Sequence, residues 1–325
     1  MTKELPQVAV DICICTFRRP HLAQTLDSLG QLEVMDGVEL RVIVADNDET
    51  PSARGVAEGF RKTSPLPLLY VHCPAGNISI ARNACLDHCT GDYVAFIDDD
   101  EVATPNWLRH LLGVAQTEDA DVVLGPVDAH YRPDAPAWLR AGDFHSTRPV
   151  WVRGRIRSGY TCNVLFRRDA VSLRRRRFDL ALGQSGGEDT DFFHRAYLAG
   201  ARFAFAPGAL LTEEVPDQRA KLGWLFRRRF RMGQTHGGLV RRDGGLAGWL
   251  AGLFPATLKV CYCLGAALIA VADPARRNAA LLRGTLHAGT VSGLLGQRAL
   301  RQYGTGRSTP AKLAHAAAKG SETSS

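Results

Sequence analysis

The sequence has 325 residues, of which 45% are hydrophobic and 22% are charged. This composition is typical of a globular protein with a large core and argues against a disordered chain. The formal net charge of +7 indicates an anionic partner, such as a phosphate, a nucleic acid or an acidic membrane surface.

The first half of the chain alternates predicted strands with predicted helices. Short apolar runs predict strands, and apolar residues spaced three and four apart predict helices. The predicted strands are residues 8–17, 38–48, 93–100 and 120–131, and the predicted helices are residues 21–32, 78–89 and 105–116. Strands that alternate with helices need crossover connections, so we predict an α/β fold with a mostly parallel sheet flanked by helices.

Polar side chains lie at the carboxyl ends of three of these predicted strands. They are Thr16 and Arg18, then Asp46 to Asp48, then Asp98 to Asp100. The carboxyl ends of parallel strands meet at one edge of a sheet, and ligands bind beyond that edge. We therefore predict a ligand site there.

Four consecutive carboxylates, Asp98 to Glu101, end the third predicted strand. They repel one another unless a cation lies between them, and Mg²⁺ or Mn²⁺ prefers oxygen ligands. A nucleoside diphosphate explains the cation, because its phosphates need a divalent metal. The alternative is a solvated acidic loop that caps the next helix.

A second acidic group lies further along the chain. The pattern becomes irregular after Pro133, and order returns at residues 161–171 and 183–207. In the latter segment two glycines precede Glu188 and Asp189 at the expected start of a helix. Carboxylates there suit the helix dipole as caps. The functional interpretation is a general base that takes the proton of an acceptor hydroxyl.

Basic residues also form distinct groups. Arg82, in the helix predicted over residues 78–89, is either a partner for phosphate and acids or a surface residue. Residues 227–236 form a basic run that suits a solvated helix face or a grip on a diphosphate, and residues 172–179 read as an exposed basic turn. The chain shows no nucleic-acid-reading module, so we expect no nucleic-acid partner.

The cysteines and the N-terminal segment concern the cellular compartment. The eight cysteines show no C-x-x-C spacing, and we expect mostly buried thiols instead of disulfides or zinc ligands. The N-terminal segment has only a short apolar run, interrupted by Asp11, and no signal-peptide pattern. We therefore expect a cytoplasmic protein.

In their order along the chain, these motifs resemble the family 2 inverting glycosyltransferases of bacteria, which have the GT-A fold. The resemblance covers residues 8–240 and rests on VDICICTFRRPHLAQTLDSL, VIVADNDE, GNISIARNACLDHCTGDYVAFIDDDEVATPNWL and SGGEDTDFF. Within the family, the chain is most similar to succinoglycan-type exopolysaccharide glucosyltransferases. The resemblance implies a Rossmann-like GT-A domain over residues 1–240, with a nucleotide-binding half over residues 1–130 and an acceptor half over residues 131–240.

The resemblance also implies a role for each matching residue. Asp189 would be the catalytic base, and Glu188 would contact the acceptor or the donor sugar. Residues on the nucleotide-sugar side would be Thr16, Arg18, Asp46, Asp48, Arg82, Asp98 and Asp99, with Asp100 and Asp98 as the metal ligands. Residues on the acceptor side would be Asn163, Arg229 and Arg231.

The implied activity is inverting transfer of a sugar from a nucleotide-diphosphate sugar, by default a UDP-sugar, to a hydroxyl of a glycan or lipid-linked glycan. The cofactor would be Mg²⁺ or Mn²⁺. The second strand departs from the family's acid-acid-Gly-Ser pattern, since it reads Asp46-Asn47-Asp48-Glu49, which leaves open which side chain contacts the base. The chain also lacks the Q-x-x-R-W motif of processive synthases, so we expect a single addition.

Two alternatives remain open at this point. A nucleotidyltransferase also uses a parallel sheet and a metal-binding acid pair, although residues 15–25 lack the glycines of its phosphate loop. A membrane-bound scaffold with the same fold but no turnover is the second alternative. Release of a nucleoside diphosphate instead of diphosphate separates the first from a glycosyltransferase.

The last part of the chain suggests a membrane. Residues 244–272 contain a single charged side chain, Lys259, and arginines flank the segment on both sides. Pro255 and several glycines weaken a spanning helix, so we expect a pair of interfacial helices within a helical segment over residues 241–307. The protein would then lie on the inner face of the cell membrane. We expect residues 308–325 to be disordered.

Overall fold

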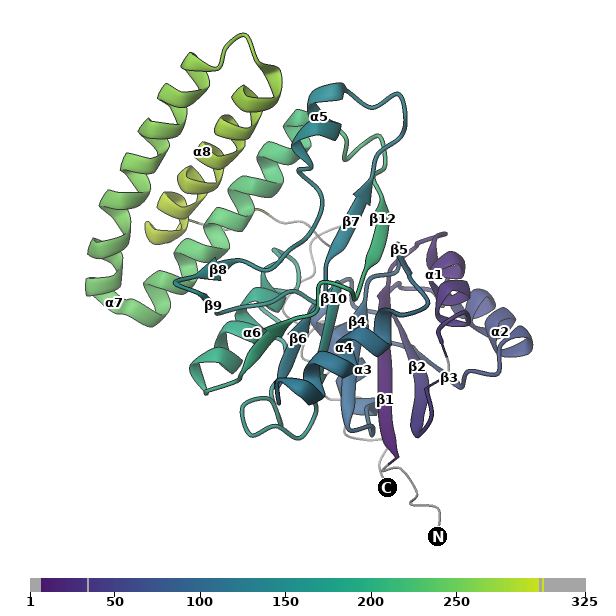
Figure 1. The fold of residues 1–325 in the computed structure, drawn as a ribbon. Helices are drawn as coiled ribbons and strands as arrows, with labels where there is room; N and C mark the ends of the chain where they lie inside the picture. The colour runs from purple at the N-terminus through teal and green to yellow at the C-terminus, as the bar shows by residue number, and fades with distance from the viewer. Residues whose placement is uncertain (1–6, 34, 298–299, 301–325) are drawn as a thin grey trace.

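The computed structural model describes residues 7–33, 35–297 and 300 (Figure 1). Its centre is a seven-stranded sheet in the order β11-β6-β10-β4-β1-β2-β3. The strands are β1 Val8–Thr16, β2 Val38–Asp46, β3 Leu68–His72, β4 Tyr93–Ile97, β6 Val122–Leu124, β10 Asn163–Arg167 and β11 Phe203–Phe205. All neighbours pair in parallel except β10, which is antiparallel to both β4 and β6. The predicted, mostly parallel α/β sheet is confirmed.

Helices cover both faces of this sheet. The helices are α1 Leu22–Leu29, α2 Arg54–Thr63, α3 Ile78–His88, α4 Trp107–Thr117, α5 Ala137–Gly142, α6 Glu188–Leu198, α7 Leu222–Ile269 and α8 Pro274–Leu294. One core cluster joins α1, α2 and α4 to residues such as Ile12 and Ile14 of β1. A second cluster joins α3 and α6 to Cys13 on the opposite face of the same strand. The side chains of β1 alternate between the two layers because successive strand residues point to opposite faces.

Two parts of the first half differ from the elements predicted above. Helix α2 and strand β3, between Arg54 and His72, had no counterpart in our prediction. The single strand predicted over residues 120–131 is wrong: β6 ends at Leu124, and β7 (Val127–His130) belongs to another sheet. Pro126 lies at the break and has no N–H for a ladder hydrogen bond. The chain therefore leaves the main sheet there.

The strand β7 belongs to a small sheet above the main one (Figure 1). Its order is β5-β12-β7, with β5 Glu101–Ala103 and β12 Leu211–Glu214. Strand β5 begins directly after Asp98 to Asp100, so the small sheet extends from the carboxyl end of β4. A separate hairpin is made of β8 (Trp151–Val152) and β9 (Arg155–Ile156).

Helices α7 and α8 form a layer beside the sheets (Figure 1). Helix α7 starts at Leu222, inside the range 1–240 that we assigned to the GT-A domain, and bends at Gly245, whose φ is 54°. A Cβ added to Gly233 would lie 2.0 Å from the carbonyl oxygen of Leu286, and one added to Gly289 would lie 2.0 Å from that of Phe230. Glycines therefore allow the two helices to pack backbone against backbone.

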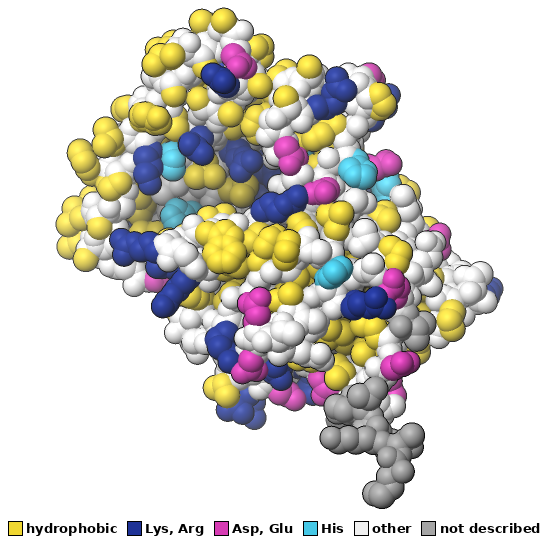
Figure 2. All heavy atoms as spheres, in the orientation of Figure 1, with side chains coloured by type: hydrophobic (Ala, Val, Ile, Leu, Met, Phe, Trp, Pro, Cys, Tyr) yellow, Lys and Arg dark blue, Asp and Glu magenta, His cyan; other side chains and the backbone are white. Residues whose placement is uncertain are grey.

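The second half of α7 carries much of the exposed apolar surface of the molecule. Within the described residues, α7 is the one helix long and apolar enough to cross a membrane, and 17% of its apolar window is buried. Figure 2 shows apolar side chains gathered over this helical layer. The most exposed large ones on α7 are Leu246, Phe254, Tyr262, Leu268 and Ile269. The predicted disordered tail, residues 308–325, lies outside the described residues.

All eight cysteines are free thiols. Four are buried, three are half-buried and Cys261 is exposed. The Sγ atoms of Cys13 and Cys89 are 3.5 Å apart beneath α3. Most of these cysteines therefore contribute to packing, as we predicted from the composition.

Candidate active site

The carboxyl ends of β1, β2 and β4 lie side by side, as the sequence predicted. Thr16 at the end of β1 pairs with Asp46 at the end of β2, and Asp46 pairs with His72 on β3. The backbone N–H of Asn47 donates to the carbonyl of Thr16 at 2.9 Å. Asp98 follows β4, the neighbour of β1 on its other side. The structure thus brings all three polar strand ends to one edge.

Asp46 organises the loop after β2. Its carboxylate accepts hydrogen bonds from the hydroxyl of Tyr70 at 2.7 Å, from the N–H of Ala53 at 2.8 Å and from the N–H of Asp48 at 3.1 Å. The side chain is fully buried. Asp46 therefore holds the shape of this loop, and only displacement of these partners would free it for a ligand.

Asp48 and Arg18 form an ion pair at 2.8 Å beside this loop. The hydrogen bond from Arg18 lowers the pKa of Asp48 to about 2. Arg18 has a φ of 54°, a left-handed conformation that is costly for residues other than glycine. Among the described residues, the Oδ1 atom of neighbouring Asn47 is buried without a hydrogen-bond partner. A buried acceptor without a partner is what a ligand donor at this edge would satisfy.

The carboxyl groups after β4 have raised pKa values. Burial raises the pKa of Asp98 to about 6, and burial together with the nearby Asp100 raises that of Asp99 to about 7. Such shifts arise where carboxylates gather in a poorly hydrated place, and they indicate that added positive charge would be bound there. The predicted acidic cluster is therefore partly buried, in contrast to the solvated loop of the alternative interpretation.

Two arginines lie against these carboxylates, and neither was predicted as a site residue. Arg19 lies 3.8 Å from Asp99 and 3.4 Å from Asp100, while Arg219 lies 3.3 Å from Asp100 and also pairs with Glu213. The consecutive arginines at 18 and 19 were a signal for the first of them. Arg219 lies far away in the sequence, and no local pattern points to it.

Two further acids extend the cluster into the small sheet. Glu101 on β5 accepts a hydrogen bond from the N–H of Asp98 at 2.9 Å, and burial raises its pKa well above the usual range. Burial, followed by the charge of Asp100, raises the pKa of Glu213 on β12 to about 7. These strands are antiparallel neighbours, with Glu213 paired to Glu101. Glu213 was not among the site residues predicted from the sequence.

A pocket of about 120 Å³ opens beside Asp100. It lies between the loop after β1 and the small sheet, and its lining residues are Arg19, His21, Gln24, Asp100, Val102, His130, Thr212, Glu214 and Pro216. The side chains around it are mostly polar. Small polar groups of a substrate fit such a space next to the carboxylates.

Arg82, Glu188 and Asp189 meet across the sheet edge. Arg82 on α3 forms a buried ion pair with Glu188 at the start of α6. The nearby Glu188, Asp189 and Asp98 raise the pKa of Arg82 against the effect of burial. Among the described residues, the second oxygen of Glu188, Oε2, is buried without a hydrogen-bond partner. The two predicted acidic clusters therefore face each other, with Arg82 between them.

Asp189 remains half-buried in the first turn of α6. Its Oδ1 accepts a hydrogen bond from the N–H of Thr190 at 2.6 Å. Gly187 precedes the helix with a φ of 91°, and a Cβ there would approach Thr235 of α7 to 2.5 Å. Glycine is therefore required at this turn, which presents Asp189 at the sheet edge.

The three residues predicted for the acceptor side have different surroundings. Asn163 is fully buried; it accepts from Nε1 of Trp107 and donates to the carbonyls of Pro126 and Ala209, each at 2.8 Å. Its side chain is committed to the core, so we no longer assign it to the acceptor. Arg229 donates to the carbonyl of Phe144, and Arg231 donates to that of Ser185.

Arg228, between the predicted arginines, is a stronger candidate for contact with a substrate. Burial lowers its pKa, and its guanidinium lies 5.3 Å from the ring centre of Trp224. Arg228 and Glu213 interact electrostatically, which places a second, half-buried cation near the acidic cluster. A basic run on an amphipathic helix does not reveal which of its members points inward.

Comparison with known proteins places this chain in a family. Residues 11–174 match the family described as "Glycosyl transferase family 2", and residues 93–272 match "Glycosyl transferase family group 2". The chain is 55% identical over 304 residues to the succinoglycan biosynthesis protein ExoM of Rhizobium meliloti (strain 1021), covering 93% of this chain and 98% of that protein. It is 28% identical over 251 residues to the glucosyl-dolichyl phosphate glucuronosyltransferase of Haloferax volcanii, covering 70% and 75% of the two chains.

A solved structure supports the fold. The mannosyltransferase PcManGT from Pyrobaculum calidifontis, in complex with GDP-Man and Mn²⁺, superposes with a TM-score of 0.60 at 21% identity, covering 90% of this chain and 88% of that one. The predicted GT-A architecture is confirmed. The family match over half of the sequence and the high identity to the Rhizobium protein agree. The chain therefore belongs to glycosyl transferase family 2.

Proposed function

We propose that this protein transfers a sugar from a nucleotide-diphosphate sugar to a hydroxyl of a glycan or lipid-linked glycan, with inversion at the anomeric carbon. One observation carries the proposal: the acids after β4 and the acids that open α6 meet at the carboxyl edge of the sheet, joined by Arg82. A donor with a diphosphate on one side and an acceptor on the other fits such an edge. The family default for the donor is a UDP-sugar.

The donor would lie over the ends of β1 and β2. Thr16, Asn47 and the Arg18–Asp48 pair border the space for the base and ribose, and the unpartnered Asn47 oxygen supplies an acceptor. We infer that Arg19 and Arg228 would contact phosphate oxygens, since guanidinium groups bind phosphates through paired hydrogen bonds. Asp99 lies beside Arg19 and would contact the ribose or the donor sugar.

A divalent ion, Mg²⁺ or Mn²⁺, fits the carboxylates after β4. Burial raises the pKa of Asp98 and of Asp99, and a bound cation would stabilise the charged forms of both carboxyl groups. Among the described residues no group of three His, Cys, Asp or Glu side chains is arranged to hold a metal alone. We infer that Asp100 and Asp98 would supply protein ligands and that diphosphate oxygens would complete the shell. When bound, such an ion stabilises negative charge on the departing diphosphate.

Asp189 is the proposed general base. As the acceptor oxygen forms its bond to the anomeric carbon, the bond from that carbon to the diphosphate oxygen breaks, and the hydroxyl proton passes to the Asp189 carboxylate. Glu188, held by Arg82, keeps one free oxygen for a sugar hydroxyl. A single displacement from the face opposite the leaving group inverts the anomeric configuration.

The acceptor is proposed from the relatives and from the helical layer. The Rhizobium relative is named for succinoglycan biosynthesis, and the Haloferax relative for transfer to a glucosyl-dolichyl phosphate. We infer an acceptor of exopolysaccharide biosynthesis carried on a lipid phosphate. The exposed apolar side of α7 would hold the enzyme on the inner face of the cell membrane, with Arg227 to Arg231 near that phosphate.

Turnover tests the chemistry. Detergent-solubilised protein is given UDP- and GDP-sugars, Mn²⁺ or Mg²⁺ and lipid extract, and release of nucleoside diphosphate is measured. We expect Asp100→Asn and Asp189→Asn each to lose at least about 100-fold in rate, while Asp189→Asn still binds donor. The exposed Asp134→Asn is the matched control. Release of diphosphate would instead indicate a nucleotidyltransferase, and neither turnover nor metal-dependent nucleotide binding would indicate a scaffold.

Sedimentation with lipid vesicles tests the membrane contact. Phe254→Glu/Leu268→Glu places two charges on the exposed apolar side of α7, where the wild-type side chains are 73% and 77% exposed. We expect this variant to stay in the supernatant while the wild type sediments. Leu198→Glu, at a site 60% exposed on α6, is the control. Equal sedimentation of all three proteins would mean that α7 is not the membrane contact.

A further inference from the structure

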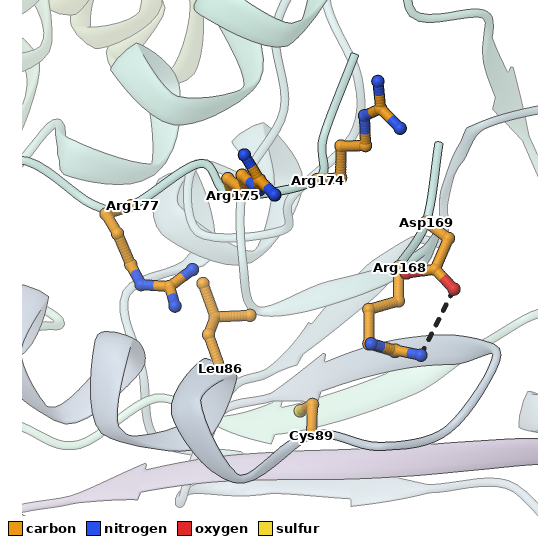
Figure 3. Close-up of a pocket in the computed structure, with 7 residues that line it drawn as sticks. All are labelled: Leu86, Cys89, Arg168, Asp169, Arg174, Arg175 and Arg177. Atoms are coloured by element: carbon orange, nitrogen blue, oxygen red, sulfur yellow. Dashed lines mark hydrogen bonds and ion pairs between the residues drawn. The ribbon is translucent and has the colours of Figure 1, made fainter. Parts of the chain in front are cut away.

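A second hollow lies at the amino ends of the parallel strands, away from the acids described above. Figure 3 draws the residues that line it. Strand β10 ends at Arg167, opposite Tyr93 at the start of β4, so residues that follow β10 lie at the amino end of the parallel strands. The pocket has a volume of about 410 Å³. Its lining residues are Leu86, Cys89, Arg168, Asp169, Arg174, Arg175 and Arg177.

Four of these seven residues are arginines, and one is an acid. Figure 3 shows Arg174, Arg175 and Arg177 along one side of the hollow, with Leu86 and Cys89 along the other. The arginines come from the basic turn over residues 172–179 and from the end of β10. The fold therefore brings Arg168 next to the arginines of the basic turn, although the two segments are separate in the sequence.

Acidic partners account for two of the four guanidinium groups. Arg168 pairs with Asp169 at 3.2 Å and donates to the carbonyl of Gly91 at 2.6 Å, while Arg177 pairs with Asp87 at 2.9 Å. For Arg174 and Arg175, no ion pair or side-chain hydrogen bond forms within the described part of the chain. Like charges gathered around a hollow repel one another, and a bound anion relieves that repulsion.

One arginine of the basic turn has a left-handed backbone conformation. Arg175 has a φ of 64°, a conformation that long side chains rarely adopt. Next to it, burial and then the charge of Arg195 lower the pKa of Arg176.

We propose that this arginine pocket binds a phosphate-bearing anion, at a site separate from the donor site. Guanidinium groups match phosphate oxygens through paired, charge-assisted hydrogen bonds. Leu86 and Cys89 give the pocket an apolar wall for the organic part of the ligand. The phosphate belongs either to a soluble molecule or to a lipid headgroup, and the experiment distinguishes these sources.

The test uses the full-length, detergent-solubilised protein and inorganic diphosphate as the probe. Binding is measured by titration calorimetry in EDTA, where the acids after β4 repel diphosphate because no divalent ion is present. We expect saturable binding that Arg174→Gln/Arg175→Gln weakens at least tenfold. Both side chains are exposed, so the variant should fold, and thermal unfolding checks this. Arg153→Gln/Arg155→Gln on the β8–β9 hairpin, also exposed, is the matched control.

A parallel arm uses vesicles of phosphatidylcholine with and without phosphatidylglycerol. Weaker sedimentation of the Arg174/Arg175 variant with the anionic vesicles alone identifies a lipid headgroup as the source. A loss of diphosphate binding with unchanged sedimentation identifies a soluble phosphate compound. If the pocket variant matches the wild type in both arms, or if the control variant loses as much, the proposal is overturned.

Discussion

Replacing Glu188 with glutamine removes the carboxylate that pairs with Arg82 between the two acidic clusters. The two side chains are 7% and 3% exposed, and nearby acids keep Arg82 charged. The substitution leaves a cation in a poorly hydrated place with Asp98 and Asp189 as its remaining electrostatic partners. Removing one partner of a buried ion pair costs about 3–5 kcal/mol, so we expect a loss of that size in the free energy of unfolding.

Thermal unfolding measures this loss. For a chain of 325 residues, the entropy of unfolding converts a loss of this size into a fall in Tm of about 5 °C. The double variant Arg82→Met/Glu188→Met leaves no buried charge and should recover at least half of the fall. Asp87→Asn breaks the exposed pair with Arg177, whose side chains are 58% and 50% exposed, and should change Tm by less than about 2 °C.

The comparison among these variants decides the reasoning. If the Glu188→Gln protein is as stable as the wild type, the ion pair does not contribute the free energy expected of a buried pair. A double variant no better than the single one would show that packing, and not the isolated charge, sets the loss. Either result would refute the inference that Arg82 and Glu188 stabilise the fold as a buried ion pair.

Three further predictions concern the surroundings of the site. Asn163→Leu leaves the carbonyl groups of two loops and an indole N–H without partners, and we expect denaturant unfolding to show a loss of about 2–4 kcal/mol with an unchanged KM for the acceptor. Arg18→Gln removes the interaction that lowers the pKa of Asp48 to about 2. Because the pKa of Asp48 is lowered in the folded state, the variant should be less stable than the wild type by a constant amount above about pH 5. This difference in the free energy of unfolding should vanish as the pH falls toward 2, and urea unfolding over a pH series measures it. Gly233→Ala should loosen α8 from α7, since the new Cβ would meet a backbone oxygen at 2.0 Å, whereas Gly238→Ala, with no atom within 4 Å, should not; limited proteolysis of α8 compares them.

Much of the site was predictable because parallel strands place their carboxyl ends together. Strands β1, β2 and β4 are apolar runs that end in polar residues, and this local pattern is enough to bring Thr16, Asp46 and Asp98 to one edge. The glycines before Glu188 likewise indicated a turn into a helix, and Gly187 occupies it with a positive φ. Predictions of this kind succeed because each depends on a few consecutive residues.

The remaining partners could not be predicted, because they meet through strands and helices distant in sequence. Arg219 reaches Asp100 across the small sheet, and Arg82 pairs with Glu188 across more than a hundred residues. Asn163 shows the opposite error, since a polar residue at a strand end was assigned to substrate although three core groups occupy it. Side-chain partners of this kind depend on how the layers pack. The local pattern of residues along the sequence does not predict them.

The amino-acid sequence by itself determined the alternation of strands and helices, the edge at which the acids gather and the apolar character of α7. These features follow from hydrophobic periodicity and from turn residues, which act over short distances along the chain. Tertiary structure alone decided which arginines pair with which carboxylates. It also decided that the chain enters a second sheet after Pro126, and that the basic turn lines a pocket at the amino ends of the parallel strands. Those outcomes depend on burial and on charges brought together by folding, and both quantities exist only once the layers have packed.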